Sequence, residues 1–162
     1  MQAIRVPQDR VGVLVGKDGE TKTMFEEKTH TTLKISGGVV EVTGDPVDEY
    51  VALAAVHAVA RGFNPKKALK LLDDNFCLVL VDLKDFASTP KSIRRLKGRV
   101  IGERGRTRKY IERSTGTYVC VYGKTVGIIG PFEAVEAAKH AVNLLLSGAQ
   151  HATAYRELDM NQ

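Results

Sequence analysis

Apolar and polar positions along this 162-residue chain follow two different periods, and each change of period marks an expected element. Alternation every second residue predicts a strand, and apolar spacings of three and four predict a helix. Pro46 suits the first turn of a helix, and Gly62 suits the position just beyond its end. In the first third of the chain, the pattern predicts a β-α-α-β-β-α order with elements at 3–6, 10–15, 20–29, 32–35, 39–43 and 46–60.

The same order of elements returns in the second half of the chain. Residues 76–81 form a continuous apolar run that predicts a buried strand. Ser88-Thr89-Pro90 predicts the cap of an extra helix through about Arg95, ahead of the short helix that leads to Ile101. A further helix is expected after Gly105, and a short helix is expected between the two halves. The remaining ranges are 66–72 for the connecting helix, 117–122 and 125–129 for a hairpin, and 132–146 for a long helix.

An internal repeat with an offset of 86 residues relates the two halves without a gap. It places Gly16 on Gly102 and Gly19 on Gly105, so one module has been used twice. Other identical pairs are Gly12 and Gly98, Thr21 and Thr107, Glu26 and Glu112, Thr29 and Thr115, Gly44 and Gly130, and Gly62 and Gly148.

The repeat predicts two domains, at residues 1–62 and 76–149. A linker helix at 63–75 joins them, and a C-terminal tail occupies 150–162. Because little flexible sequence separates the copies, we expect them to pack against each other as one rigid body.

Each copy carries a GxxG motif between two expected helices, at residues 16–19 and 102–105. Glycine has no Cβ, so Gly102 and Gly105 permit unusual backbone angles and the close approach of another backbone. The N-terminus of the following helix presents unpaired N–H groups and a partial positive charge, which suit a phosphate. The loops are therefore predicted to hold a sugar-phosphate backbone.

Charge distinguishes the two copies. The chain carries a net +5, yet residues 91–113 hold ten basic and two acidic residues, a local net of +8 that leaves −3 elsewhere. A basic patch of this kind is typical of a nucleic-acid interface. Solvation alone does not explain why the charge gathers beside one loop. On the helix after that loop, one face holds Arg106, Lys109 and Arg113, where the first copy has Glu20, Thr23 and Glu27.

The second GxxG, its basic helix and the strand-like TGTYVCVYGKTVGIIG that follows resemble the KH module of RNA-binding proteins. GRVIGERGRTRKYIERSTGTYVCVYGKTVGIIG, RGFNPKKALKLL and LLLSGAQHATAYREL further resemble archaeal relatives of the Pno/Dim family, which matures small-subunit ribosomal RNA. The resemblance implies an α+β fold of two eukaryotic-type (type I) KH domains, each with a three-stranded sheet covered by three helices. The implied ligand is the 3′ region of small-subunit rRNA. Implied partners are the nuclease that trims that end and the α subunit of translation initiation factor two.

The second copy is expected to carry most of the RNA binding. In the first copy, Glu20 and Glu27 place carboxylates beside the loop, and these would repel the phosphates that the loop is predicted to hold. In KH modules the bases lie between the helix after the loop and the middle strand, here taken as the strand with Tyr118. Whether Tyr118 and Cys120 or Val119 and Val121 line that groove stays open, as does packing rather than base stacking for Tyr118. The expected RNA-binding residues are Arg99, Ile101, Gly102, Glu103, Arg104, Gly105, Arg106, Arg108, Lys109, Arg113 and Tyr118, with a secondary set of Gly16, Lys17, Asp18, Gly19 and Lys22.

Other functions find little support in the sequence. Paired carboxylates, a Cys/His pair and a nucleotide-binding Gly-Lys-Ser/Thr spacing are absent, so we expect neither an enzyme nor a cofactor. The histidines lack metal-ligand spacing, and no apolar run is long enough for a membrane span or an export signal. Cys77 and Cys120 lie in apolar runs, which favours free thiols in the cytoplasm. A protein-binding adaptor and a general binder of single-stranded nucleic acid, DNA included, remain as alternatives.

Overall fold

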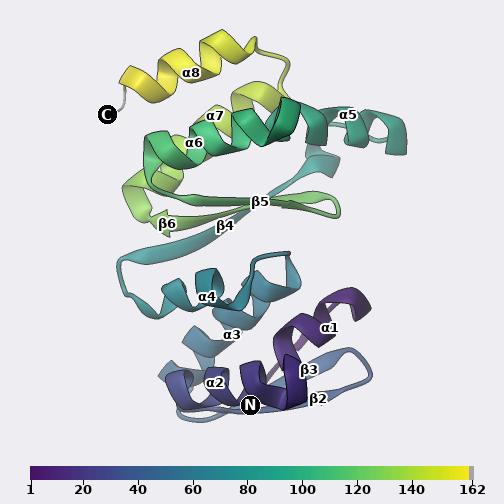
Figure 1. Cartoon of the computed structure of the whole chain (residues 1–162), viewed down its shortest axis with the longest axis vertical. Helices are drawn as coiled ribbons and strands as arrows, with labels where there is room; N and C mark the ends of the chain where they lie inside the picture. The colour runs from purple at the N-terminus through teal and green to yellow at the C-terminus, as the bar shows by residue number, and fades with distance from the viewer. Residues whose placement is uncertain (161–162) are drawn as a thin grey trace. The chain divides into compact units, whose positions relative to one another are not determined.

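The computed structural model describes residues 1–160 and divides the chain into two units, Met1–Asp74 and a second unit that begins at Asn75. Each unit holds a three-stranded antiparallel sheet with helices against one face (Figure 1). This arrangement confirms the α+β class and the repeated β-α-α-β-β-α order. The expected domain limits and the rigid packing of the two modules stay predictions.

The first unit contains six elements of the module and one additional helix. These are β1 (Gln2–Arg5), α1 (Gln8–Val15), α2 (Glu20–Thr29), β2 (Thr32–Ser36), β3 (Val39–Thr43), α3 (Pro46–Ala60) and α4 (Pro65–Ala68). A 3-10 turn at Leu69–Leu72 follows α4. The sheet order is β1-β3-β2, and each of the six elements of the module lies within two residues of its predicted bounds. The helix predicted at 66–72 is divided between α4 and the 3-10 turn.

The second unit repeats the module. Its elements are β4 (Phe76–Asp82), α5 (Pro90–Ile101), α6 (Arg106–Thr115), β5 (Tyr118–Tyr122), β6 (Thr125–Pro131), α7 (Phe132–Leu146) and α8 (His151–Met160). The sheet order is β4-β6-β5. Val121 pairs with Val126 as Ile35 pairs with Val40, so the offset of 86 residues also holds in the register of the two hairpins.

The α5 helix corrects one prediction from the sequence. The hydroxyl oxygen of Thr89 accepts a hydrogen bond from the Ser92 backbone N–H at 3.1 Å, as expected for a cap. The expected end near Arg95 is wrong, because α5 continues to Ile101 as a single helix. Ile93, Leu96 and Val100 explain the difference, since their spacing of three and four places all of them on one buried face.

The α8 helix occupies most of the segment that the sequence analysis described only as a tail. Residues 161 and 162 of that tail lie outside the described residues. Ala154 and Leu158 are buried and belong to the core of the second unit. Figure 1 shows α8 as an outer layer over α6 and α7. The four-residue apolar spacing of this pair was the available signal for a helix.

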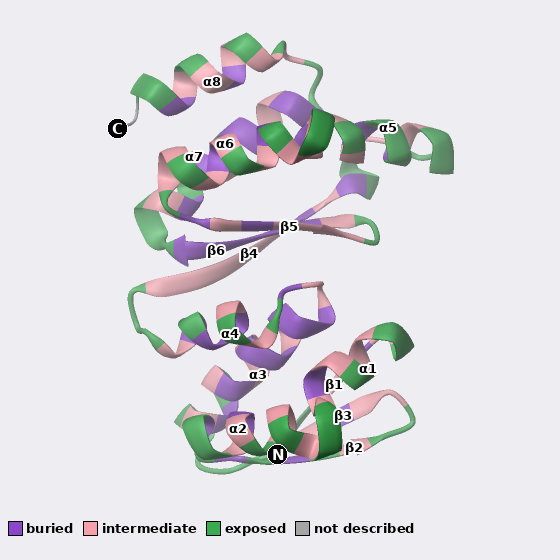
Figure 2. Ribbon diagram, in the orientation of Figure 1, coloured by how far each residue is buried: buried purple, intermediate pink, exposed green. Residues whose placement is uncertain are grey.

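Buried residues, coloured purple in Figure 2, occur on both the strands and the helices of each unit. In the second unit, Val119 of β5 and Ile128 of β6 pack in one cluster with Ile111 of α6. Burying one such side chain stabilises a fold by about 1.5–3 kcal/mol. This packing fixes the position of α6, and with it the loop that precedes α6, relative to the edge of the sheet.

His57 on α3 is expected to make the stability of the first unit depend on pH. Burial, and then the charge of Arg61, lower the pKa of this half-buried imidazole. Its contribution to stability is therefore present above the pKa of an unfolded histidine, about 6.5, and is lost as pH falls through the lower pKa of the folded state. The melting temperature of His57→Gln should fall less than that of the wild type between about pH 7.5 and about pH 5. Equal pH dependence in the two proteins would contradict this expectation.

Candidate nucleic-acid interface

The second GxxG loop is a tight reversal between α5 and α6. Gly102, with φ 75° and ψ 171°, ends α5, and a 3-10 turn over Glu103–Gly105 leads directly into α6. Arg104 and Gly105 also have positive φ, at 56° and 74°. The loop therefore presents the side chains of Glu103 and Arg104 to solvent, ahead of the N–H groups that begin α6.

The first glycine of this motif packs against the helix that follows. A Cβ at Gly102 would lie 2.7 Å from the backbone nitrogen of Thr107 and would overlap the threonine side chain. The same relation holds in the first copy, where a Cβ at Gly16 would lie 2.9 Å from the nitrogen of Thr21. Glycine is thus required at both positions by its conformation and by this close approach.

The first loop has nearly the same backbone as the second. Gly16, Asp18 and Gly19 have φ values of 76°, 54° and 77°, and Lys17 and Asp18 are exposed. Both copies therefore retain the shape of a clamp, and they differ in the charges around it.

The basic face predicted for α6 is present. Arg106, Lys109 and Arg113 are all exposed, and the guanidinium of Arg113 lies over the ring of Tyr110, 6.0 Å from its centroid. The corresponding positions on α2 are also exposed, and they hold Glu20, Thr23 and Glu27. The two loops thus open helices of opposite surface charge.

Arg108 and Lys22 take part in a second contact that recurs in both copies. A carboxylate oxygen of Glu112 accepts a hydrogen bond from the Val119 backbone N–H at 2.9 Å, and the other lies 3.7 Å from Arg108 Nη1. In the first copy, Glu26 accepts from the Leu33 N–H at 2.9 Å and pairs with Lys22. These contacts join each helix to the edge strand beside it.

The guanidinium of Arg99 donates hydrogen bonds to backbone carbonyls within the fold. Its Nε donates to the Leu145 carbonyl at 2.8 Å, and its Nη2 donates to the Ala149 carbonyl. Arg10 makes the same pair of bonds in the first copy, to the carbonyls of Val59 and Phe63, which lie 86 residues before the acceptors of Arg99. Both arginines therefore bind the carbonyls at the end of the long helix that closes the module.

A groove of about 520 Å³ lies between α5 and the turn that joins β5 to β6. Ile101 is the predicted site residue that this groove includes. Sequence reasoning missed the others, because the surface appears only when α5 is one continuous helix with Arg94, Lys97 and Ile101 along one side. The lining residues are Pro90, Ile93, Arg94, Lys97, Gly98, Ile101, Gly123 and Lys124.

The position of β5 corrects another expectation. Tyr118 was placed on the middle strand, but β5 lies at the edge of the sheet and β6 is central. Val119 is buried and Val121 packs on the same core, so this pair faces the helices. Alternation places Tyr118 and Cys120 on the opposite face. An RNA contact by Tyr118 stays a prediction.

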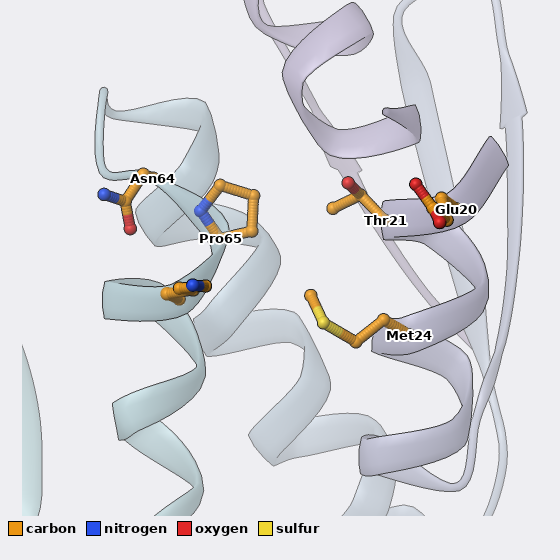
Figure 3. A pocket seen from close by; sticks show the side chains of 6 residues that line it. Glu20, Thr21, Met24, Asn64 and Pro65 are labelled. Carbon is orange, nitrogen blue, oxygen red and sulfur yellow. The ribbon is translucent and has the colours of Figure 1, made fainter. Parts of the chain in front are cut away.

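In the first unit, a groove of about 540 Å³ lies beside the first loop, between α2 and α4. Met24 and Pro65 extend into it from opposite sides, and Thr21 lies at its margin (Figure 3). At the equivalent place in the second unit, Tyr155 of α8 stacks on Tyr110. The two copies thus differ in what covers the helix after the loop.

Residues 1–160 contain no group of three or more His, Cys, Asp or Glu side chains placed to hold a metal ion. Over the same residues, no helix combines the length and the apolar character that crossing a bilayer requires.

A GxxG loop that opens a helix beside the edge of a three-stranded sheet is the geometry of a KH domain, a nucleic-acid-binding module. Family models agree with this assignment in both units. The model for the second KH domain of PNO1, described as a eukaryotic-type (type I) KH domain, matches residues 77–162. A general KH-domain model matches residues 1–58.

Relatives extend the match to nearly the whole chain. A KH domain-containing protein of Methanocaldococcus jannaschii is 47% identical over 98% of this chain and 73% of its own length. The pre-rRNA-processing protein PNO1 of Chaetomium thermophilum is 35% identical over 64% of this chain and 41% of its own length. In a solved a/eIF2α-aDim2p-rRNA complex from Pyrococcus horikoshii, the matching chain has a TM-score of 0.92 and 38% identity, with 98% of this chain and 92% of that chain covered. The chain belongs to the Pno/Dim family of double-KH-domain proteins.

Proposed function

We propose that this protein is a ribosome-assembly factor that binds single-stranded RNA in the 3′ region of small-subunit rRNA. The second KH domain makes most of the contacts, through its loop, the basic face of α6 and the groove beside α5. The protein acts by binding and catalyses no reaction.

The observation that carries this proposal is the coincidence of loop shape and charge in the second copy. The exposed backbone around Gly102–Gly105 leads into a helix N-terminus, which favours an anion. Arg104, Arg106 and Lys109 are exposed on this loop and on the helix that follows. Phosphates held by the loop would therefore lie within a region of positive potential.

The groove beside α5 suits the bases that such a clamped strand would carry. Ile101 supplies apolar surface, to which the largely buried Ile93 adds little, and a Cβ at Gly98 would meet no atom within 4 Å, which leaves room for a flat ring. Arg94 and Lys97 line the same groove and supply positive charge for the backbone. Stacking on such a platform tolerates different bases, so sequence preference would depend on the edges of the groove.

The first copy is proposed to make a weaker, secondary contact. Its loop has the backbone shape of the second, and Lys17 and Lys22 supply positive charge. Glu20 and Glu27 lie on the exposed face of the next helix, where phosphates would meet carboxylates. Repulsion there lowers the affinity of this copy without removing its clamp.

The relatives support the choice of ligand and partners. One relative is named as a pre-rRNA-processing protein, and the solved complex contains rRNA and a/eIF2α beside aDim2p. We extend both associations to this chain, with the α subunit of translation initiation factor two as one partner. The nuclease that trims the rRNA end is a further proposed partner, and the cytoplasm is the proposed location.

Crosslinking in cells tests the proposed ligand. The protein would be crosslinked to total RNA, and the attached fragments would be sequenced. Reads should accumulate at the 3′ end of small-subunit rRNA. A broad distribution over messenger RNAs would exclude the ribosomal assignment while leaving the KH fold intact.

Two further measurements distinguish the alternative functions. Recovery of protein partners without RNA would favour an adaptor. Equal affinity for RNA and for a DNA strand of the same sequence would favour a general binder of single-stranded nucleic acid.

Salt is expected to weaken RNA binding strongly. If the second copy neutralises about four to six phosphates, the logarithm of the association constant should fall against log salt with a slope of roughly −3 to −4. Replacing Arg106 and Lys109 with alanine should make the slope shallower by about 1 to 2, since each phosphate contact on a single strand contributes about 0.7 to the slope. Lys70→Ala removes a charge from an exposed position outside both loops and serves as the control. A slope near zero for the wild type would show that the basic patch is not the RNA surface.

A further inference from the structure

The α8 helix contacts the start of α6 through Tyr155. The ring of Tyr155 lies 4.2 Å from that of Tyr110, centroid to centroid, and the ring planes are tilted by 32°. The Tyr155 hydroxyl lies 3.1 Å from Oγ1 of Thr107, within hydrogen-bonding distance. Tyr155 therefore reaches past the stacked ring to the first turn of α6.

Thr107 connects this contact to the GxxG loop. It is buried, and it is the residue against which Gly102 packs so closely that a Cβ has no room. A shift of Thr107 would consequently open the space behind Gly102 and release the reversal of the backbone. The Tyr155 hydroxyl contacts Oγ1 of Thr107, which is also the threonine atom nearest to the position of a Cβ at Gly102.

A second contact joins the start of α8 to the end of α5. His151 Nε2 lies 3.0 Å from the carbonyl oxygen of Arg99, in the last turn of the helix before the loop. The guanidinium of Arg99 donates in turn to the carbonyl of Ala149, two residues before α8. Contacts in both directions therefore hold the end of α5 against the segment that begins α8.

We propose that α8 is a brace for the second RNA clamp, in which His151 fixes the helix before the loop and Tyr155 fixes the helix after it. Gly102–Gly105 then spans two helix ends that cannot move apart. His151 and Tyr155 are positioning residues in this role, because they act through Arg99 and Thr107. The inference rests on the proposed function, since a loop that is already ordered binds RNA without first losing conformational freedom.

The charge of α6 explains why this copy needs a brace. An acidic residue in the first turn stabilises a helix through its dipole, and α2 has Glu20 there. The first turn of α6 has no acidic residue and begins with Arg106, whose charge opposes the dipole. The basic residues that suit RNA thus weaken the helix start, and the contact from Tyr155 to Thr107 offsets this loss.

The first copy supplies the internal comparison. At the offset of 86 residues, Pro65 and Leu69 stand in place of His151 and Tyr155, and neither side chain can form a hydrogen bond. Thr21, the counterpart of Thr107, lies at the margin of the groove between α2 and α4 (Figure 3). The first loop therefore has the same shape without the brace.

Tyr155→Phe tests the brace, and Tyr110→Phe is its matched control. Each variant removes one hydroxyl from the same stacked pair, but the Tyr110 hydroxyl donates to Asp159 on α8 and does not touch the loop. Tyr155→Phe should speed amide hydrogen exchange at residues 102–107 and weaken RNA binding, both by about two- to tenfold, as expected for one lost hydrogen bond. Tyr110→Phe should leave both values within about twofold of the wild type, and exchange at residues 16–21 should not change in either variant.

His151 provides an independent rescue experiment. His151→Ala should produce the same local exchange and the same loss of affinity, whereas His151→Gln, whose side-chain amide can still donate to the Arg99 carbonyl, should restore both. Equal effects of Tyr155→Phe and Tyr110→Phe, or unchanged exchange at residues 102–107 in Tyr155→Phe, would overturn the brace. Exchange is measured without RNA. If the wild type fails to bind RNA, the proposed function falls, while faster exchange at residues 102–107 in Tyr155→Phe but not in Tyr110→Phe still supports the brace.

Discussion

Replacing Glu103 and Arg104 together with aspartate is expected to weaken RNA binding at least tenfold. Both side chains are exposed on the second loop, so the change places carboxylates where phosphates would lie. The fold should tolerate it, because Asp18 already occupies the equivalent of position 104 with φ 54°, against 56° for Arg104. Each charged contact that is lost should cost about 1–3 kcal/mol. The measurement is a titration with a short RNA from the 3′ end of the small-subunit transcript.

Lys17→Asp in the first loop is the matched comparison for this variant. It creates two adjacent aspartates at the same backbone positions, since Lys17 and Asp18 align with Glu103 and Arg104. We expect a smaller loss of affinity, because Glu20 and Glu27 already make this face unfavourable to phosphates. Circular dichroism would first establish that both proteins are folded. If Lys17→Asp proves the weaker binder, the roles of the two copies are reversed.

Gly102→Ala is expected to abolish RNA binding by the second copy and to lower the free energy of unfolding by roughly 2 to 6 kcal/mol. With φ 75° and ψ 171°, Gly102 lies in a backbone region that essentially only glycine adopts, and an L-residue there costs about 1–3 kcal/mol. The new methyl group would also meet the backbone of Thr107, and such overpacking costs about 1–3 kcal/mol. Urea unfolding and RNA titration of the same variant would measure both effects.

Two other glycines separate the causes of this loss. Gly105 has the left-handed helical backbone, with φ 74° and ψ 13°, and a Cβ there would meet only Lys109 Cε at 3.9 Å, so Gly105→Ala should show only the smaller left-handed cost of about 1–2 kcal/mol. Gly12, inside α1, has neither a positive φ nor a neighbour within 4 Å, and Gly12→Ala should stabilise the protein by about 0.5–1 kcal/mol. Equal stability of Gly102→Ala and Gly105→Ala would mean that the packing against Thr107 does not constrain the loop.

Much of the fold could be predicted from local pattern. The limits of α2, α3 and α7 match their predicted ranges, and the cap at Thr89 is present. The break expected near Arg95 was wrong, because a charged pair on one side of a helix does not interrupt an apolar stripe on the other. The prediction that the strand with Tyr118 lies in the middle of the sheet was also wrong, because β4 pairs with β6. The sequence of a hairpin does not show which of its two strands a strand distant in the chain will pair with.

The sequence alone specified the repeated module, the two GxxG loops and the opposite charges of α2 and α6. Glycine conformation, helix caps and apolar periods act over a few residues, so they can be recognised without a structure. The tertiary structure alone placed Arg99 on carbonyls 46 and 50 residues away, and Tyr155 on Thr107 across 48 residues. It also showed the groove beside α5. Such contacts depend on where packed elements meet, and side-chain type and spacing along the chain do not encode that meeting point.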